Sequence, residues 1–326
     1  MGFLSLAAAL LAQYFRSHNA SNPFQQTFHS LALFLERQFN AGKRHYGVMA
    51  WFAAVLAVLI PVVLIYVFIY NAGPIGKLLA LLINATALYF ALSFRGVSLQ
   101  LREVQQALQR DDIDDARTKL GDYLDRSVVL YSRDELSRVT IEQILLSAHK
   151  DLFAPMIWFL VLPGPIGPLF YILARELADA WSHNDSVQEN TDQTTALPPF
   201  GHFAQQVWEW IDWVPRRITA LSFGIAGDFQ DAMECWRAQA HTWPRPNDGI
   251  VLASGAGALE VRLGLPLTTA AGADYRPEIG TGEHVQVDFV ESAEGLVWRA
   301  LALWLAVLVL VTLASAITFV TTNFSL

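Results

Sequence analysis

The amino-acid sequence predicts an all-α polytopic membrane protein: a transmembrane hairpin, a cytoplasmic helical domain with a re-entrant broken segment, and one C-terminal transmembrane helix. The chain has 326 residues, of which 53% are hydrophobic and 16% charged, whereas roughly 25% of the residues of a soluble globular domain carry charge. Its apolar residues gather in three runs without ionised side chains, at 48–70, 78–94 and 300–320. Lysine and arginine are distributed unevenly around these runs.

The three apolar runs have the length of membrane spans. A helix needs about 20 apolar residues to cross roughly 30 Å of hydrocarbon, and about 17 is the lower limit. The runs at 48–70 and 300–320 meet this requirement comfortably, and the run at 78–94 meets it narrowly. Uncharged runs of this length are rare in soluble cores. The N-terminal stretch 3–15 is shorter and lacks the basic start of a signal peptide, so we expect it to form an interfacial or packed anchor helix.

The basic residues predict the orientation of the hairpin. Lys and Arg precede the first run and recur after the second, whereas the connector 71–77 carries only Lys77. Cytoplasmic segments beside membrane spans are enriched in Lys and Arg. We therefore expect both flanks of the hairpin, and the bulk of the polar chain, in the cytoplasm of a bacterium whose inner (plasma) membrane holds the protein. The uncharged tail 321–326 is then expected on the outer side.

Between the second and third runs the pattern becomes that of amphipathic helices. One is expected from residue 95 to 108, a second from Ile113 to Leu124, and a third that begins with Asp134 as its cap. The predicted segments are an N-terminal anchor and amphipathic helix (1–46), the hairpin (47–95), a cytoplasmic helical unit (96–151), a re-entrant or kinked membrane segment (152–182), a mobile loop (183–199), a cytoplasmic or interfacial helical region (200–295) and the C-terminal span (296–326).

Two of these segments leave alternatives open. Residues 152–173 are apolar but interrupted by prolines and glycines, and proline kinks a helix. A re-entrant pair of short helices is favoured over a bent element packed inside protein, since irregular backbone cannot face lipid. The tryptophan-rich stretch 203–214 suits either the bilayer interface or a helix packed on the domain core.

Several kinds of site are disfavoured by the residues. The single cysteine, Cys235, cannot form an intramolecular disulfide, and no two of the eight histidines are three or four apart, as metal ligands on one helix would be. A net charge of −8 without a basic cluster argues against nucleic-acid binding. The small-residue run 253–258 contains one GxG without a third glycine at dinucleotide-binding spacing, so close helix packing explains it better.

The order of motifs along the chain resembles the CobD/CbiB family, the adenosylcobinamide-phosphate synthases of cobalamin biosynthesis, and its relative AmpE, a membrane protein associated with β-lactamase induction. The resemblance covers most of the chain, and its last motif is the most specific. The matching segments are Asn22-Pro23-Phe24, Leu35-Glu36-Arg37, Arg126-Ser127-Val128, Arg138-Val139-Thr140-Ile141-Glu142, Ala154-Pro155, Trp213-Val214-Pro215-Arg216-Arg217-Ile218, Arg245-Pro246-Asn247-Asp248-Gly249 and Ala256-Gly257-Ala258-Leu259-Glu260-Val261-Arg262-Leu263.

The departures from the family motifs affect the chemistry that the resemblance implies. The family reaction joins an amine-bearing phosphate ester to a corrinoid carboxylate and is expected to use a nucleotide and Mg²⁺, which prefers hard oxygen ligands. Ser127 replaces the family acid of an Arg-Asp-Thr element. Lys150 falls where a carboxylate-rich helix end is expected, and Arg175 to Ala178 replace an Asn-Thr-Leu-Asp element with Asp179 one place late. A lysine repels a cation but suits a phosphate.

Three functions follow from this resemblance and these departures. The first is an AmpE-like paralogue with a degenerate synthase site that acts in ligand binding, scaffolding or signalling. The second is an active, amide-forming synthase, and the least favoured is a small-solute permease, since transporters also build sites from broken helices. Catalytic residues are not assigned. Candidate ligand-binding residues are Arg126, Arg138, Glu142, Lys150, Asp151, Glu176, Asp179, Arg216 and Asn247.

The expected partners and cofactors are few. We expect the lipid bilayer, a corrinoid or other anionic small molecule and no nucleic acid as partners, and a homo-oligomer is left open by the small residues 314–316. No metal or cofactor is assigned, and Mg²⁺ and a nucleotide are expected only if synthase activity is retained. A purely structural role is the alternative for Glu142 and Arg138, which are four residues apart on one predicted helix and would pair on its face.

Overall fold

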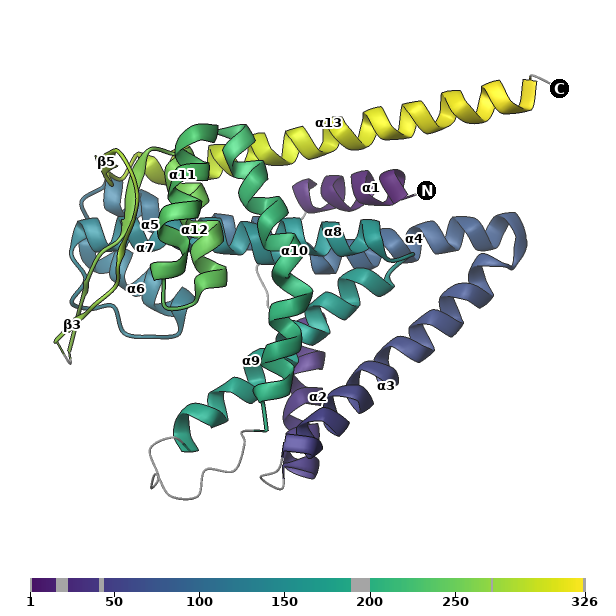
Figure 1. Cartoon of the computed structure of the whole chain (residues 1–326), viewed down its shortest axis with the longest axis horizontal. Helices are drawn as coiled ribbons and strands as arrows, with labels where there is room; N and C mark the ends of the chain where they lie inside the picture. Colours follow the sequence, from purple (N-terminus) through teal and green to yellow (C-terminus); the bar gives the residue numbers. More distant parts are fainter. Residues whose placement is uncertain (1, 16–22, 41–43, 189–199, 271, 325–326) are drawn as a thin grey trace. The chain divides into compact units, whose positions relative to one another are not determined.

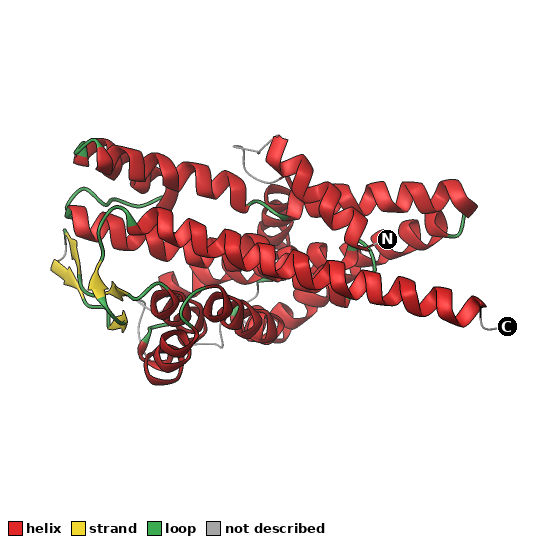
Figure 2. Cartoon of the chain, turned by 90° about the horizontal axis from the view of Figure 1, so that it is seen from above, coloured by secondary structure: helices red, strands yellow, loops and turns green. Residues whose placement is uncertain are grey.

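The computed structural model of the chain describes residues 2–15, 23–40, 44–188, 200–270 and 272–324. It is mostly helical, and the few strands lie together in one small region (Figure 2). The chain divides into two compact units, of which the first comprises Met1–Arg95 and Ala154–Pro215 and the second comprises Gly96–Phe153 and Arg216–Leu326.

The first unit is built from long apolar helices. They are α1 (Gly2–Phe15), α2 (Pro23–Phe39), α3 (Arg44–Tyr70), α4 (Gly73–Ala91), α8 (Ala154–Val161), α9 (Ile166–Gln188) and the first half of α10 (His202–Ala226). Helices α3 and α4 form the predicted hairpin (Figure 1). Its turn is tighter than the expected connector 71–77, because α4 already begins at Gly73, whose φ of +86° favours glycine.

Helix α1 packs along α4, as one of the two expected alternatives for the N-terminal stretch. The Gln13 side-chain amide donates to the backbone carbonyl of Tyr89 at 2.9 Å. Leu6 and Ala9 are buried, whereas Leu4 and Leu11 are about 60% exposed. The apolar residues of α1 therefore face protein on one side only.

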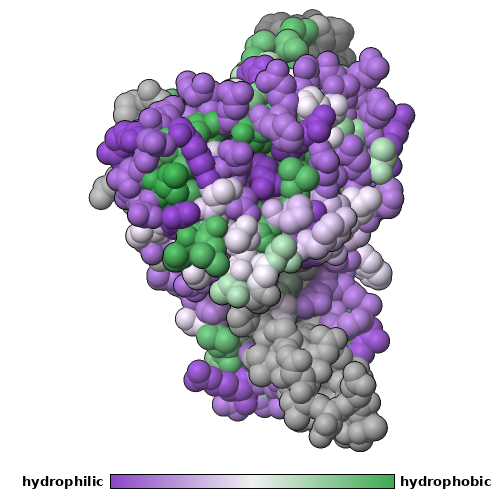
Figure 3. All heavy atoms as spheres, turned by 90° about the vertical axis from the view of Figure 1, so that its left-hand side faces the viewer, coloured by the Kyte–Doolittle hydropathy of each residue, from purple (hydrophilic) through white to green (hydrophobic). Residues whose placement is uncertain are grey.

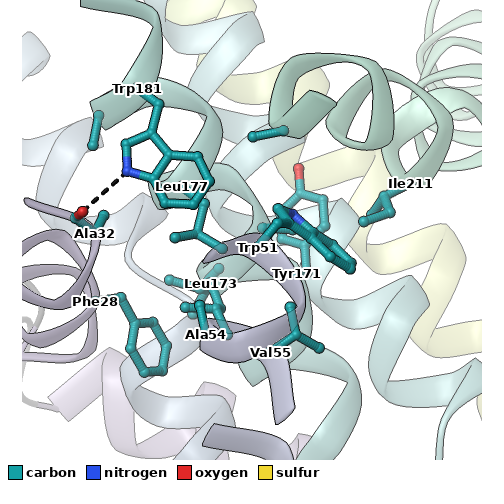
Figure 4. Packing of buried hydrophobic residues seen from close by; sticks show 14 of the residues in the cluster. Phe28, Ala32, Trp51, Ala54, Val55, Tyr171, Leu173, Leu177, Trp181 and Ile211 are labelled. Atoms are coloured by element: carbon teal, nitrogen blue, oxygen red, sulfur yellow. Dashed lines mark hydrogen bonds between the residues drawn. The ribbon is translucent and has the colours of Figure 1, made fainter. Parts of the chain in front are cut away.

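The core of the first unit lies where α2, α3, α9 and α10 meet (Figure 4). Trp181 and Tyr171 of α9 are its largest fully buried side chains. The indole N–H of Trp181 donates to the carbonyl of Ala32 on α2 at 3.0 Å, so the polar atom of this tryptophan is satisfied. Figure 4 shows Trp51 of α3 beside Tyr171 in the same cluster.

The proline-rich segment forms a helical hairpin in which α8 and α9 pack on each other across residues 162–165. Gly164 at the bend has a φ of +70°, and a Cβ on Gly167 would lie 2.0 Å from the carbonyl oxygen of Trp158. The predicted pair of helices meeting at the prolines is therefore present. Its entry into a bilayer stays a prediction. The predicted mobile loop at 183–199 is wrong over 183–188, which continue α9, and 189–199 lie outside the described residues.

The second unit combines amphipathic helices with a small β region and the long apolar helix α13. Its elements are α5 (Phe94–Gln109, whose first two residues belong to the first unit), α6 (Ile113–Leu124), α7 (Arg133–Ala148), the π-helical turn η1 (His149–Phe153), the second half of α10, α11 (Phe229–Gln239), the short 3₁₀ helix η2 (Ala240–Thr242), α12 (Pro246–Ala258), five strands and α13 (Phe289–Phe324). Its strand-bearing end is largely hydrophilic, with small separate hydrophobic patches (Figure 3).

Helix α7 begins with a cap that differs from the expected one. The predicted cap, Asp134, lies inside the first turn. Ser132 caps the helix instead, because its hydroxyl accepts from the backbone N–H of Glu135 at 3.3 Å while the Glu135 carboxylate accepts from the backbone N–H of Ser132 at 2.6 Å. This reciprocal capping box satisfies two donors at once, which a single aspartate does not.

The strands contradict the expectation of an all-α fold. They are β1 (Val261–Gly264), β2 (Leu267–Thr269), β3 (Gly272–Asp274), β4 (Glu278–Gly280) and β5 (Glu283–His284). Strand β1 lies between antiparallel β4 and parallel β5, and β2 and β3 form a separate antiparallel pair. They lie within the predicted helical region 200–295, where α12 ends at Ala258. Strands of two to four residues are too short to establish an alternating pattern.

The small-residue run 253–258 packs helices closely, as predicted. A Cβ on Gly257 would lie 2.5 Å from the backbone carbonyl oxygen of Asp231 on α11, and one on Gly255 would lie 2.7 Å from Leu145 of α7. Side chains at either position would force α12 away from these neighbours. The run therefore has a packing role in the second unit.

Four stretches among the described residues are long and apolar enough to cross a membrane: Arg44–Tyr70, Gly73–Gln109, Arg133–Val161 and Phe289–Ser315. The first and second contain the predicted runs 48–70 and 78–94, and the fourth contains residues 300–315 of the predicted run 300–320. The third was not predicted as a span, and 67% of its most apolar window is buried inside the protein, compared with 11% for α3. The chain therefore has the helices of a membrane protein.

Candidate functional site

The nine candidate residues are distributed over both units. Glu176 and Asp179 lie on α9 in the first unit, whereas the others belong to the second unit. Those of the second unit occupy the loop after α6, helix α7, the turn η1, helix α10 and the start of α12, at Arg126, Arg138, Glu142, Lys150, Asp151, Arg216 and Asn247. Each group is described in turn.

Glu142 and Arg138 of α7 converge on one glycine of strand β1. The Glu142 carboxylate accepts from the backbone N–H of Gly264 at 3.0 Å, and the guanidinium of Arg138 donates to the backbone carbonyl of the same glycine. Glu142 is 2% exposed and Arg138 is 8% exposed. Gly264 has a φ of +74°, and a Cβ there would lie 2.0 Å from the carbonyl oxygen of Pro277. The two side chains thus hold a backbone turn that requires glycine.

Arg276 completes this arrangement, which we call the Gly264 clamp (Arg138, Glu142, Gly264 and Arg276). Its guanidinium donates to both carboxylate oxygens of Glu142, at 2.6 and 3.1 Å, and to the carbonyl of Gly264 at 3.2 Å. It also lies over the ring of Trp243, 5.3 Å from the ring centre. Both oxygens of Glu142 are therefore occupied by protein donors. Such bidentate pairs are strong and geometrically specific.

Arg276 was missed by the sequence reasoning. It lies 134 residues from Glu142 in the chain, in an Arg-Pro dipeptide without a motif. The expected pairing of Glu142 with Arg138 on the helix face is replaced by their shared contact with Gly264. A structural role for both residues is nevertheless what the geometry supports, because their polar atoms join α7 to the β region.

Arg126 lines a cleft between α6 and the loop that follows it. The cleft has a volume of about 590 Å³. Its lining residues are Asp114, Arg117, Thr118, Gly121, Asp122, Asp125, Arg126, Ser127, Val128 and Val129. The Arg117 guanidinium is engaged with the Asp114 carboxylate at 3.0 Å and the Tyr131 carbonyl at 3.0 Å. Among the described residues the side chain of Arg126 has no hydrogen bond or ion pair, so its guanidinium is available to an anion.

Arg216 and Asn247 lie near each other around the start of α12. The carboxylate of Asp248 is 3.9 Å from Nη2 of Arg216 and 3.4 Å from Nε of Arg245. Arg216 and Asp248 are both about 95% buried, whereas Asn247 is half-buried. The glycine that follows is required, since a Cβ on Gly249 would lie 2.2 Å from the carbonyl oxygen of Ala240. This motif therefore fixes the entry into α12 and places a buried ion pair there.

Lys150 and Asp151 lie in the π-helical turn η1 between α7 and α8. Both side chains are half-buried. Their neighbour His149 is fully buried, and its ring Nδ1 lies 3.0 Å from the hydroxyl of Thr219 on α10. π-Helical turns occur frequently at functional sites, and this one was not predicted.

The first unit brings Glu176 together with basic side chains. Its carboxylate lies 3.7 Å from Nη2 of Arg175 and 3.8 Å from Nδ1 of His29. Asp179, one turn later, is exposed. A buried pair in the same unit was missed: the Tyr171 hydroxyl donates to the Asp212 carboxylate at 3.1 Å, and both residues are fully buried.

The described residues do not form a metal site made of protein ligands alone, because no three His, Cys, Asp or Glu side chains gather closely enough among them. Mg²⁺ is often held by one or two carboxylates together with substrate phosphates. Glu142 does not fit this role, because Arg276 and Gly264 occupy its oxygens.

Comparison with known proteins identifies relatives along nearly the whole chain. The model of the family CobD/Cbib protein matches residues 6–297. The cobalamin biosynthesis protein CobD of Stutzerimonas stutzeri is 32% identical over 310 residues, which cover 94% of this chain and 96% of that protein. The protein of the same name from Chromobacterium violaceum is 32% identical over 246 residues, covering 74% and 72% of the two chains.

A more distant relative is the cobalamin biosynthesis protein CobD of Mycobacterium tuberculosis, which is 27% identical over 209 residues, or 63% of this chain and 64% of that protein. No solved structure matches the chain. The family model extends from α1 into α13 and so includes every candidate residue named above. The chain belongs to the CobD/CbiB family of cobalamin biosynthesis proteins.

Proposed function

We propose that this chain is an AmpE-like member of the CobD/CbiB family whose synthase site is degenerate, and that it acts in ligand binding, scaffolding or signalling at the bacterial inner membrane. One observation carries the proposal: the family-motif carboxylate Glu142 has both oxygens occupied by Arg276 and by the backbone of Gly264. A carboxylate with these partners serves the fold and is not available as a metal ligand or a general base.

The substitutions in the other motifs support the same proposal. Ser127, in place of the expected acid, lines the cleft that also contains Arg126. Lys150 occupies the π-helical turn where the family motif has carboxylates. Each change removes negative charge or adds positive charge, which disfavours Mg²⁺ and favours an anion.

The ligand that fits these residues is a corrinoid or another anionic small molecule. The cleft of about 590 Å³ is within the usual range for small-molecule sites. Arg126 supplies a guanidinium suited to phosphate or carboxylate. The three aspartates of the lining, Asp114, Asp122 and Asp125, would select against a ligand that carries several negative charges.

Equilibrium binding of cobyric acid, a corrinoid with a free carboxylate, to the purified protein in nanodiscs tests this part of the proposal. We expect saturable binding that is weakened at least tenfold in Arg126→Ala, because a charge-assisted hydrogen bond contributes about 1.5–3 kcal/mol. Arg110→Ala is the matched control, since Arg110 is an exposed arginine outside the cleft. Equal binding by both variants would remove the cleft from the proposal.

An active amide-forming synthase is the second candidate. It is favoured by the 32% identity over 94% of the chain with a cobalamin biosynthesis protein and by the retained cluster of Arg216, Asn247 and Asp248. In this case Asp151, which belongs to the same unit as that cluster, would take over the role of the missing carboxylates. Formation of the amide from a corrinoid carboxylate and an amino-alcohol phosphate, with ATP and Mg²⁺ supplied, would establish this candidate and overturn the first.

A further inference from the structure

The first half of helix α10 presents large apolar side chains to its surroundings. Trp210 is 80% exposed, Trp213 is 50% exposed and Val214 is 48% exposed. Residues three and four apart lie on one side of a helix, so the three form a single face, whereas Ile211 and Asp212 are buried on the other side. Contiguous exposed apolar surface of this kind marks a contact with a partner or a membrane.

The first turns of α10, which precede this face, pack on α3, the most exposed apolar helix of the same unit. The ring of Phe203 in the first turn of α10 packs against Trp51 and Phe52 of α3, with ring centres 5.7 and 6.0 Å apart. Arg44 at the start of α3 donates to the side-chain oxygen of Gln206 at 3.0 Å. Figure 1 shows the two helices near each other at these ends.

Helix α3 indicates what surrounds this part of the molecule. Only 11% of its most apolar window is buried. Its exposed apolar surface includes Phe52, which is 49% exposed and is the same ring that contacts Phe203, and it continues through Leu56 and Ile60. A helix that carries no charge from Tyr46 to Tyr70 and has this surface is solvated by lipid. Helix α10 therefore starts where α3 enters the bilayer.

We propose that Trp210, Trp213 and Val214 form an interfacial anchor that inserts into the headgroup layer of the bilayer that α3 crosses. Tryptophan is enriched at this depth because its ring is apolar while its indole N–H remains able to bond with polar groups. The anchor is independent of the ligand and chemistry of the family site.

Spin labels at single cysteines in the full chain, reconstituted into nanodiscs, test the anchor. Trp210→Cys and Val214→Cys would be made in a Cys235→Ser background. Collision of each label with oxygen, which partitions into lipid, and with a water-soluble nickel chelate reports its depth. Leu64→Cys on α3 is the reference for hydrocarbon, and Tyr275→Cys in the β region is the reference for water, since the native side chains are 65% and 79% exposed.

We expect both α10 labels to give depths between the two references, with most of the nickel-chelate collision seen at residue 275 lost. A label at Val214 as accessible to the chelate as the one at 275 would overturn the proposal. Low collision with both reagents would also overturn it, because it would mean that protein covers this face. Thermal unfolding of each variant in detergent, compared with Cys235→Ser alone, checks that the labelled proteins are folded.

Discussion

The carboxylate of Glu142 on α7 accepts the backbone N–H of Gly264 in β1 at 3.0 Å, across 122 residues of sequence. The glycine has a backbone conformation that other residues rarely adopt, and Arg138 and Arg276 bind its carbonyl. A family-motif carboxylate is thereby committed to joining a helix and a strand. Glu142 therefore has a role in the fold of the second unit.

Removing the charge of Glu142 is expected to destabilise the second unit strongly. In Glu142→Gln the ion pair with Arg276 is lost and a guanidinium that is 12% exposed keeps its charge without a counter-ion. Breaking a buried ion pair in this way costs about 3–5 kcal/mol. Chemical unfolding in detergent measures the change. Asp134→Ala is the control, because Asp134 is an exposed acid on the same helix, and a similar loss there would contradict the clamp.

Alanine substitutions at Gly264 and Gly272 would distinguish the effect of steric crowding on stability from the effect of backbone strain. Both have positive φ, but a Cβ on Gly264 would lie 2.0 Å from a backbone oxygen, whereas nothing lies within 4 Å of one on Gly272. We expect Gly272→Ala to lower the free energy of unfolding by about 1–3 kcal/mol through strain alone, and Gly264→Ala to lower it further. Equal losses of unfolding free energy in the two variants would mean that neighbouring atoms shift and relieve the crowding at Gly264.

Cys235 of α11 is expected to react slowly with alkylating reagents in the folded protein. Burial and then the nearby charges of Asp231 and Glu234 raise its pKa to about 11, so about one thiol in a thousand is ionised at pH 8. Mass spectrometry after iodoacetamide treatment compares folded and denatured protein. Fast alkylation of the folded chain at pH 8 would contradict the buried position.

The raised pKa of the same thiol predicts in which direction the stability of the fold changes with pH. The pKa of Cys235 is raised above that of the unfolded chain, which is about 8.5. Its contribution to the free energy of unfolding is therefore fully present below about pH 8.5 and is lost as the pH rises through 11. Cys235→Ala should show a smaller loss of stability between pH 8.5 and 11 than the wild-type chain, measured by thermal unfolding. An unchanged pH profile would count against this linkage.

The features of the fold that depend on composition could be predicted from the sequence. Uncharged runs predicted the helices α3, α4 and α13, and periodic apolar residues predicted α6 with its observed bounds, Ile113–Leu124. The capping of α7 was less accessible, because Asp134 and Ser132 both suit a helix start and the choice depends on the reciprocal bond to Glu135. Local sequence patterns thus predicted which helices form better than they predicted where a helix begins or ends.

The site could be predicted only in part, because its partners are distant in sequence. Motif resemblance identified Glu142 and Arg138 as candidates. It did not predict that Arg276 and Gly264 would donate hydrogen bonds to the Glu142 carboxylate. Arg276 lies among strands of two to four residues, which are too short for a periodic signal. Arg126 lines a cleft, and its role as a ligand-binding residue stays a prediction.

Complementation is the most direct test of the degenerate synthase site. The chain would be expressed in a strain that lacks the adenosylcobinamide-phosphate synthase, in medium where growth requires that step. Expression of the Stutzerimonas stutzeri relative in the same strain tests the assay, and immunoblotting of membranes controls for expression. We predict that this chain reaches the membrane and does not restore growth. Restored growth, lost again in an Asp151→Ala variant that is still present in the membrane, would contradict the account.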